Sequence, residues 1–313
     1  MSAPPDVPPP DVPPPDVPPP DVAALAERRA AARAAKDFAE SDRLRDELAE
    51  AGWSVRDRPG GYTLTPRPPY DVLPSVDALP DRSGEPDTHR CTVALLVDGW
   101  PEDVQTCVRA LLAHTPRDVR VVLLENGRTD AGVVVHELAG GRVTSWHVER
   151  PAGWGPARQA LVRADTAAVH VLMDLSSVLE GDALTPLLAA LDDPGVAAAG
   201  WRGVQVRDGW TEFEDADAGD VEALLGYLVA VRRSAALQVP LPAKAVFYRN
   251  ADIEWSFLLR EAGVGRLVAV DLPVRQDRHH GYHDSDPVLR DRESRKTYDR
   301  FLQRFRGREE LRL

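Results

Sequence analysis

Acidic side chains in this 313-residue chain stand where an α/β sheet would present them to a ligand. Asp174 directly follows the apolar run 169–173, which has the pattern of a buried strand, and Ser176 lies two residues further on. In an open parallel sheet, ligands bind outside the carboxyl ends of the strands. We therefore predict that Asp174 faces a ligand crevice. The alternative is that its carboxylate only caps the turn that follows.

Two earlier loops carry polar residues in equivalent places. The apolar run VRVVLLEN ends in Glu125 and Asn126, and Asp130 lies four residues beyond. After the next run, VTSWHVE, a glycine-bearing loop places Gly153 ahead of Arg158. Because the carboxyl ends of parallel strands share one edge, we expect these loops to meet along that edge of the sheet.

Two later segments carry charge and imidazole groups. Asp252 and Glu254 stand at the start of the predicted helix IEWSFLLREAG, where their structural role would be to complement the helix dipole. His279, His280 and His283 fall within five positions of one another. These three histidines either bind a metal ion or are surface residues of a turn, and the sequence alone leaves both interpretations open.

The elements that would position these residues alternate between strand and helix from Cys91 onward. Continuous apolar runs such as CTVALLV predict buried strands, and EDVQTCVRALLAHT has apolar residues at helical spacing. The order predicts an α/β fold with a Rossmann-like, mostly parallel sheet flanked by helices. A nucleotide-dependent dehydrogenase is disfavoured because Gly153 and Gly155 follow the third strand and lack the full glycine fingerprint.

Composition limits the classes of function. The chain is 43% hydrophobic without an apolar run of membrane length, and it lacks a signal-like start, so we expect a cytoplasmic protein. Its net charge of -12 argues against nucleic-acid binding by the whole molecule. Cys91 and Cys107 are too few for a disulfide framework, and we predict that both are buried.

Composition also divides the chain into four parts. Residues 1–22 repeat the pentad PPPDV, which predicts an extended, disordered tether. Residues 23–66 predict a helical mini-module that ends in a β-hairpin, and residues 67–90 predict a linker without periodicity. Residues 91–313 predict the α/β domain with a C-terminal helix.

The mini-module resembles the small C-terminal module of cysteinyl-tRNA synthetases over about residues 22–66. The residues that carry the resemblance are Lys36-Asp37-Phe38, Asp42, Arg45-Asp46 and Gly52. In that family the module lies by the tRNA anticodon, so the resemblance implies RNA contact through residues 23–66. The alternative is a helical hairpin that docks or dimerises. The chain lacks the HIGH and KMSKS-type signatures and zinc ligands, and these absences argue against a synthetase.

Residues 91–277 resemble family 2 glycosyltransferases, which have the GT-A fold. The matching motifs are Glu125-Asn126-Gly127-Arg128-Thr129-Asp130, Gly153-Trp154-Gly155-Pro156-Ala157-Arg158, Asp174-Leu175-Ser176 in place of Asp-x-Asp, and Asn250-Ala251-Asp252-Ile253-Glu254-Trp255. The resemblance implies an enzyme that transfers a sugar from a nucleotide-sugar donor to an acceptor hydroxyl, with inversion expected by analogy. It identifies neither donor nor acceptor, and it leaves peripheral contact with a membrane open.

The resemblance also implies roles for single residues. Those assigned to the donor are Glu125, Asn126, Asp130, Gly153, Arg158, Asp174 and Ser176, with Glu125 accepting hydrogen bonds from the base or ribose. Asp174 and a late histidine, for which we select His280, would hold Mn²⁺ or Mg²⁺ at the diphosphate. Asp252, with Glu254 beside it, would act as the general base on the acceptor hydroxyl.

Three departures from the family pattern weaken this assignment. Ser176 replaces the second carboxylate of Asp-x-Asp, and a hydroxyl is a poorer ligand for a hard cation. Glu125 stands where the family usually has Asp, and Ala251 stands where it usually has Glu. The competing hypothesis is therefore a catalytically degenerate GT-A fold that binds a nucleotide sugar, RNA or a protein.

Overall fold

The computed structural model describes residues 17–58 and 60–313. They form two compact units, the first ending at Pro69 and the second spanning Tyr70–Leu313. Each unit has its own buried apolar cluster. Most of the predicted tether, residues 1–16, lies outside the described residues, so its disorder stays a prediction.

The first unit is a helical hairpin followed by a β-hairpin, as predicted. Its elements are α1 (Pro20–Ala34), α2 (Phe38–Glu50), β1 (Trp53–Arg58) and β2 (Gly61–Pro66). α1 begins three residues earlier than expected, because proline is well tolerated in the first turn of a helix, where no backbone donor is needed. Asp37 caps α2 by accepting a hydrogen bond from the Glu40 amide at 3.1 Å.

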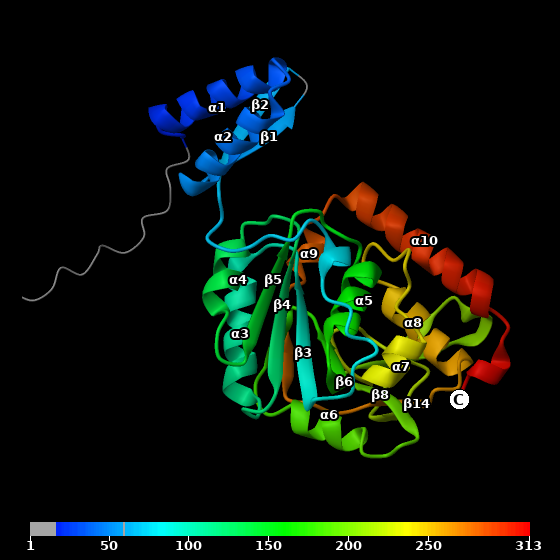
Figure 1. The fold of residues 1–313 in the computed structure, drawn as a ribbon. Coiled ribbons are helices and arrows are strands. Elements are labelled where there is room, and N and C mark those ends of the chain that lie inside the picture. The colour runs from blue at the N-terminus through cyan, green and yellow to red at the C-terminus, as the bar shows by residue number, and fades with distance from the viewer. Residues whose placement is uncertain (1–16, 59) are drawn as a thin grey trace, which may run out of the picture. The chain divides into compact units, whose positions relative to one another are not determined.

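The second unit is built on an eight-stranded sheet (Figure 1). In spatial order its strands are β11 (Gly219–Asp220), β14 (Arg266–Ala269), β8 (Val196–Gly200), β13 (Leu228–Arg232), β6 (Ala167–Met173), β3 (His89–Val97), β4 (Arg120–Asn126) and β5 (Val143–Val148). β6, β3, β4 and β5 are parallel, whereas β13 runs antiparallel to both of its neighbours. The mostly parallel sheet predicted from the sequence is thus confirmed.

Helices cover both faces of this sheet (Figure 1). One face packs against α3 (Pro101–His114), α4 (Gly132–Leu138) and α6 (Leu184–Ala190). The other packs against α5 (Trp154–Ala164), α7 (Arg233–Gln238) and α8 (Ala251–Glu261). Side chains of a strand alternate between faces, so Val93 and Leu95 belong to the first core and Ala94 and Leu96 to the second.

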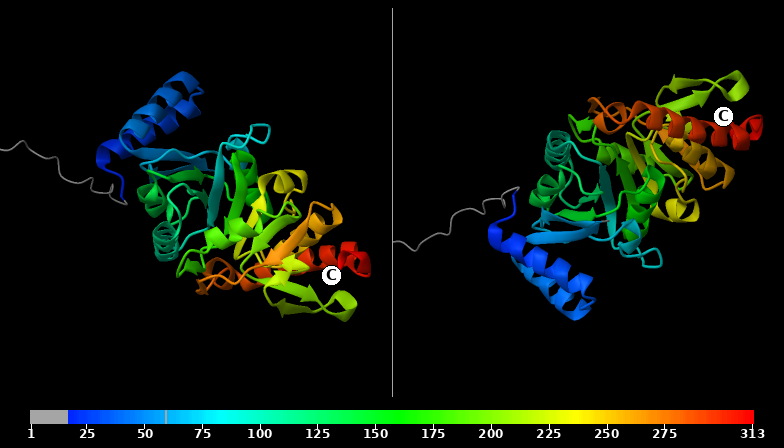
Figure 2. Two further views of the ribbon diagram at one scale, coloured as in Figure 1. Left: turned by 90° about the horizontal axis from the view of Figure 1, so that it is seen from below. Right: turned by 90° about the horizontal axis from the view of Figure 1, so that it is seen from above.

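The remaining elements lie outside the eight-stranded sheet. They are a small sheet of β10 (Phe213–Ala216), β9 (Gly203–Val206) and β12 (Ala223–Leu224), the pair β15 (Val274–Gln276) and β7 (Ser177–Leu179), the helices α9 (His280–His283) and α10 (Pro287–Phe305), and three short 3₁₀ turns. β9 and β10 lie beside α10 in both views of Figure 2. Trp210, Phe257, Phe301 and Phe305 form the aromatic core there.

The predicted linker 67–90 requires revision, because most of it belongs to the second unit. Leu73 pairs with the edge strand β5 through hydrogen bonds to His147 and Glu149 of 2.8 Å each. Val76 and Leu79 are buried in the core beside α5. The segment has no helical or strand periodicity because residues 70–88 form an irregular strap ahead of β3. Several of its apolar residues are nevertheless buried within the second unit.

Candidate functional site

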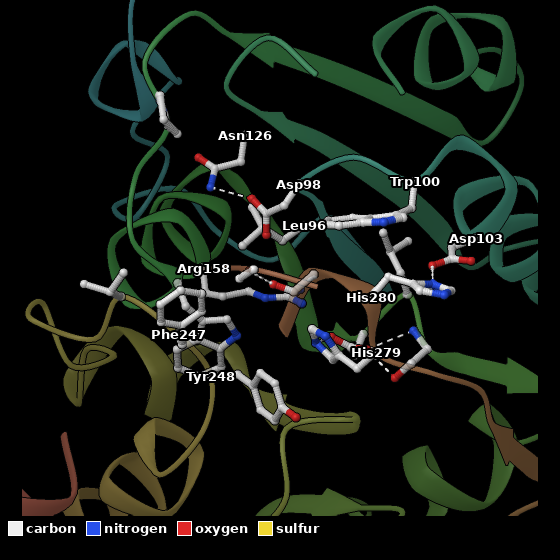
Figure 3. Close-up of a pocket in the computed structure, with 18 of the residues that line it drawn as sticks. Leu96, Asp98, Trp100, Asp103, Asn126, Arg158, Phe247, Tyr248, His279 and His280 are labelled. Carbon is white, nitrogen blue, oxygen red and sulfur yellow. Dashed lines mark hydrogen bonds and ion pairs between the residues drawn. The ribbon is translucent and has the colours of Figure 1, made fainter. Parts of the chain in front are cut away.

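A cavity of about 240 Å³ opens at the carboxyl ends of β3, β4 and β6 (Figure 3). Its lining includes Leu96, Asp98, Trp100, Asp103, Asn126, Trp154, Arg158, Asp174, Ser176, Phe247, Tyr248, Arg278, His279 and His280. Of the ten predicted site residues, Asn126, Arg158, Asp174, Ser176 and His280 line it. The position agrees with the rule that ligands bind beyond the carboxyl ends of parallel strands.

Asp174 lies in this cavity with both carboxylate oxygens hydrogen-bonded. Its Oδ1 accepts from the Ser176 amide at 2.8 Å and from the Ser176 hydroxyl at 2.5 Å. Its Oδ2 lies 2.7 Å from His279 Nε2. Burial alone would raise the Asp174 pKa, but the charge and hydrogen bond of His279, helped by Ser176, outweigh it and lower that pKa.

The two neighbouring histidines have different partners. His279, and not the selected His280, contacts Asp174, whereas His280 Nδ1 lies 2.6 Å from Asp103 on α3 (Figure 3). His279 Nδ1 also accepts a hydrogen bond from the Tyr282 amide at 2.9 Å. Burial lowers the His279 pKa, but the charge of the Asp174 carboxylate and its hydrogen bond to His279 raise it by more. The His279 pKa is therefore raised overall.

Arg158 forms part of the cavity wall and holds two strands together. It is 2% exposed, and its guanidinium donates to the carbonyls of Ala94 at 2.7 Å and Met173 at 2.9 Å. Burial lowers its pKa to about 10. Asp98 and Asp174 are the nearest opposite charges and favour the charged form. Arg158 is therefore a buried cation beside two carboxylates.

Asn126 and Asp98 make a second polar group in the cavity. The Asn126 amide nitrogen donates to Asp98 Oδ1 at 2.8 Å and to the Ala152 carbonyl at 2.9 Å, and its oxygen accepts from the Ala152 amide. Within the described residues, Asp98 Oδ2 has no hydrogen-bond partner. The cavity walls displace water around Asp98 and raise its pKa, although its side chain is exposed to the cavity.

Glu125, Asp130 and Gly153 do not line this cavity. The Glu125 carboxylate is 1% exposed and points inward, where it accepts from the Thr129 amide at 2.7 Å and pairs with His147 at 2.7 Å. Asp130 is exposed beside Gly99, and Gly153 precedes α5. As arranged, Glu125 orders a loop, and its proposed contact with a base or ribose needs another geometry.

Asp252 also lies outside the cavity. It is 6% exposed beside a small inner space that it shares with Trp154, and its oxygens accept from the Gly226 amide at 2.8 Å and the Ile253 amide at 2.9 Å. Burial raises its pKa to about 6. That pKa suits a general base near neutral pH. For the Asp252 carboxylate to contact an acceptor hydroxyl in the cavity, however, the Trp154 side chain, which lines both spaces, would have to move.

Glu254 is paired rather than available. Its carboxylate accepts hydrogen bonds from Arg300 of α10 at 3.2 and 2.9 Å. The pair joins α8 to α10, which explains why both ends are largely buried. The arrangement supports a structural role for Glu254, and its predicted catalytic role stays untested.

Sequence reasoning missed several cavity residues. Asp98 follows the first strand in the same way as Asp174 follows β6, so the strand-end rule would have found it. Trp100 has φ +58°, a strained conformation for a bulky residue, and lies about parallel to His280 at a ring distance of 6.3 Å. Backbone strain of this kind concentrates at functional sites, and no sequence signal announces it.

A divalent cation does not fit the cavity as it is arranged. Asp174 Oδ2 would have to exchange its hydrogen bond with His279 for a metal–oxygen bond. Among residues 17–58 and 60–313, no group of three or more His, Cys, Asp or Glu side chains is placed to hold a metal ion. The same described residues contain no helix long and apolar enough to cross a membrane.

Comparison with known proteins finds a different family model for each unit. Residues 15–63 match the cysteinyl-tRNA ligase anticodon binding domain, and residues 99–253 match glycosyl transferase family 2. A cysteine–tRNA ligase of Opitutus terrae is 63% identical over 43 residues, which are 14% of this chain and 9% of the ligase. That of Thioalkalivibrio sulfidiphilus is 62% identical over 40 residues, 13% of this chain and 9% of the ligase. The chain thus spans under a tenth of these relatives.

Two solved glycosyltransferases share the fold of the second unit. GalNAc-T7 with UDP, GalNAc and Mn²⁺ has a TM-score of 0.57 and 16% identity, covering 68% of this chain and 48% of that one. The mannosyltransferase PcManGT from Pyrobaculum calidifontis, in complex with GDP-Man and Mn²⁺, has a TM-score of 0.50 and 18% identity. The match covers 84% of this chain and 71% of the mannosyltransferase. At these identities the likeness shows the fold alone. The second unit therefore has the GT-A fold, and its residues 99–253 match the model of glycosyl transferase family 2.

Proposed function

We propose that this protein transfers a sugar from a nucleotide-sugar donor to a hydroxyl group of an acceptor, with inversion at the anomeric carbon. The observation that carries the proposal is the cavity at the carboxyl ends of β3, β4 and β6, which contains several charged side chains and lies in the region that matches family 2. Both solved relatives were determined with a nucleotide or nucleotide sugar.

In this proposal the donor diphosphate binds at the histidine side of the cavity. His280, through Nε2, and Arg278 supply donors there, and Arg158 adds a buried positive charge. A developing negative charge on the leaving diphosphate would be stabilised by such fixed donors. The free oxygen of Asp98 would accept a hydrogen bond from a hydroxyl or N–H group of the donor.

Proton removal from the acceptor hydroxyl is assigned to Asp252 as a proposal. Its raised pKa of about 6 keeps most of the carboxylate ionised near neutral pH. Because the two hydrogen bonds from Gly226 and Ile253 hold it outside the cavity, the proposal requires the Trp154 wall to shift when the acceptor binds. Asp252→Asn should then lower kcat about 10²-fold or more with donor affinity unchanged.

The second candidate function is donor binding without turnover. It is favoured by the saturated carboxylate of Asp174 and by the position of Asp252 outside the cavity. The two candidates differ in one result. If Asp174→Ala and Asp252→Asn leave every measurable transfer reaction unchanged while donor still binds, the catalytic assignment is wrong and the binding function holds.

The decisive experiment is thermal unfolding of the full chain with UDP-, GDP- and dTDP-sugars, each with and without Mn²⁺. A donor at about 100 times its Kd should stabilise the native state by roughly 2.7 kcal/mol. A base-selective shift supports the proposal, and dependence on Mn²⁺ would show that the Asp174–His279 pair opens for a cation. Absence of any shift would contradict both donor hypotheses.

RNA contact through residues 23–66 is a separate proposal. It is supported by the match to an anticodon binding domain, as that domain is described for its own family. It is weakened by charge, because residues 17–69 contain nine Lys or Arg and nine Asp or Glu residues. Retention of labelled tRNA by the full chain, compared with a variant lacking residues 1–66, tests it. The cytoplasmic location and peripheral membrane contact stay predictions.

A further inference from the structure

A second cavity of about 160 Å³ lies under the same face of the sheet, at the amino-terminal halves of the strands. Thr92, Arg120, Thr144 and His170 reach it from β3, β4, β5 and β6 respectively. α5 and the strap that includes Arg82 contribute to its lining. It shares no lining residue with the cavity proposed for the donor.

A buried hydrogen-bond network orders one wall of this cavity. Asp165 Oδ1 accepts from the Thr92 hydroxyl at 2.8 Å and from the amides of Thr166 and Ala167. Asp165 Oδ2 lies 2.7 Å from His170 Nδ1. Burial would raise the Asp165 pKa, but the hydrogen bond and charge of His170, with those other donors, lower it. The lowered pKa favours the ionised form of Asp165, which accepts all of these hydrogen bonds.

Two groups of the cavity lack a partner among the described residues. His170 is 0% exposed, and its Nε2 has no hydrogen bond. Arg120 is exposed, lines the same cavity and has no hydrogen bond or ion pair with any described residue. A buried unpaired polar atom is costly, so His170 Nε2 points to a missing ligand, and the exposed Arg120 supplies a cation at the same cavity.

We propose that this cavity binds a phosphoryl group, either inorganic phosphate or the phosphate of a monoester. Its oxygens would accept hydrogen bonds from Arg120, for which phosphate is a preferred partner. Near pH 6 a phosphate monoester keeps one proton in about half of its molecules, and that proton would form a hydrogen bond to His170 Nε2. An ionised carboxylate offers acceptors only and has no such proton to donate. This site is independent of sugar transfer.

The test is a titration of the full chain with inorganic phosphate at about pH 6, where the ligand keeps a proton. Ionic strength is held constant with chloride, and amide and imidazole ¹⁵N shifts locate the binding. Saturable shifts at Thr144, Thr166 and His170 are expected. Arg120→Gln should weaken binding about tenfold, as loss of one charge-assisted hydrogen bond would.

Arg109→Gln is the matched control, because Arg109 is an exposed arginine on α3 across the sheet and should leave phosphate affinity unchanged. Glycerol phosphate distinguishes a monoester ligand from inorganic phosphate. If the site takes a monoester, glycerol phosphate should bind more tightly than inorganic phosphate. Equal affinities for Arg120→Gln and Arg109→Gln overturn the proposal, as do shifts confined to the first cavity. Acetate binding as tightly as phosphate overturns the choice of a phosphoryl group.

Discussion

His279 Nε2 lies 2.7 Å from Asp174 Oδ2, across 105 residues of sequence and at the centre of the candidate site. The contact joins the segment before α9 to the end of β6, and Tyr248 stacks on the His279 ring at 4.6 Å. It has two consequences. The Asp174 carboxylate is held by protein groups, and its charge state is linked to that of His279.

The Asp174–His279 contact should give a pH-dependent coupling energy. Because the Asp174 pKa is lowered in the folded state, its ionisation stabilises the protein above pH 3.8. This stability is lost as the pH falls through the folded pKa. The raised His279 pKa contributes stability that is complete below 6.5 and is lost as pH rises through the folded pKa. A double-mutant cycle of Asp174→Asn and His279→Gln should therefore give about 1–3 kcal/mol between these values, and less at pH 9.

Urea unfolding at pH 5.5 and pH 9 measures this cycle. His114→Gln serves as the control because His114 is exposed at the end of α3, and it should show no coupling to Asp174→Asn. A coupling that stays constant across this range would contradict the linked protonation.

Asp252→Asn should change how stability depends on pH. The folded pKa of about 6 exceeds the ordinary 3.8, so the native state binds more protons between these values and its stability falls as pH rises. The variant cannot ionise at this position. Relative to the wild type, it should gain on the order of 2–3 kcal/mol between pH 4 and pH 8.

Chemical unfolding of both proteins at the two pH values checks the Asp252 prediction. Asp299→Asn, at an exposed position on α10, should show no comparable gain. Parallel pH profiles for the wild type and Asp252→Asn would show that the carboxylate is not buried as the fold indicates.

Arg158→Met should destabilise the second unit by about 2–4 kcal/mol, because it removes two hydrogen bonds and leaves buried carbonyl groups without donors. It also removes one of the positive charges near Asp98 and Asp174, so donor affinity should fall. Arg109→Met is the control at an exposed site. Wild-type stability in Arg158→Met would mean that the two strand carbonyls find other donors.

Arg29→Ala should destabilise the first unit alone. Arg29 is 4% exposed and makes two hydrogen bonds to Asp57, at 2.8 and 3.1 Å. Its loss should cost about 1–3 kcal/mol, measured by hydrogen exchange of amides in α1 and β1. Amides of β3 and β6 should keep their protection because they belong to the other compact unit. Arg28→Ala, at an exposed site, should have little effect.

Local patterns were sufficient for much of this fold. The apolar runs that became β3, β4 and β6 were predicted because a strand buried on both faces needs apolar side chains throughout. Asp174 was found for a related reason, since its polar side chain directly follows such a run. Strap residues such as Leu73 and Val76 escaped notice, because they meet β5 and α5 without any regular spacing.

The sequence by itself determined the two-unit organisation, the strand and helix alternation, the family motifs and the strand-end position of Asp174. Only the tertiary structure decided which histidine meets Asp174, because His279 and His280 are adjacent and their directions depend on distant packing. It also turned Glu125 inward to His147 and enclosed Asp252 behind Trp154. Side-chain direction and burial arise from contacts between distant segments, whereas strand and helix arise from neighbours along the chain.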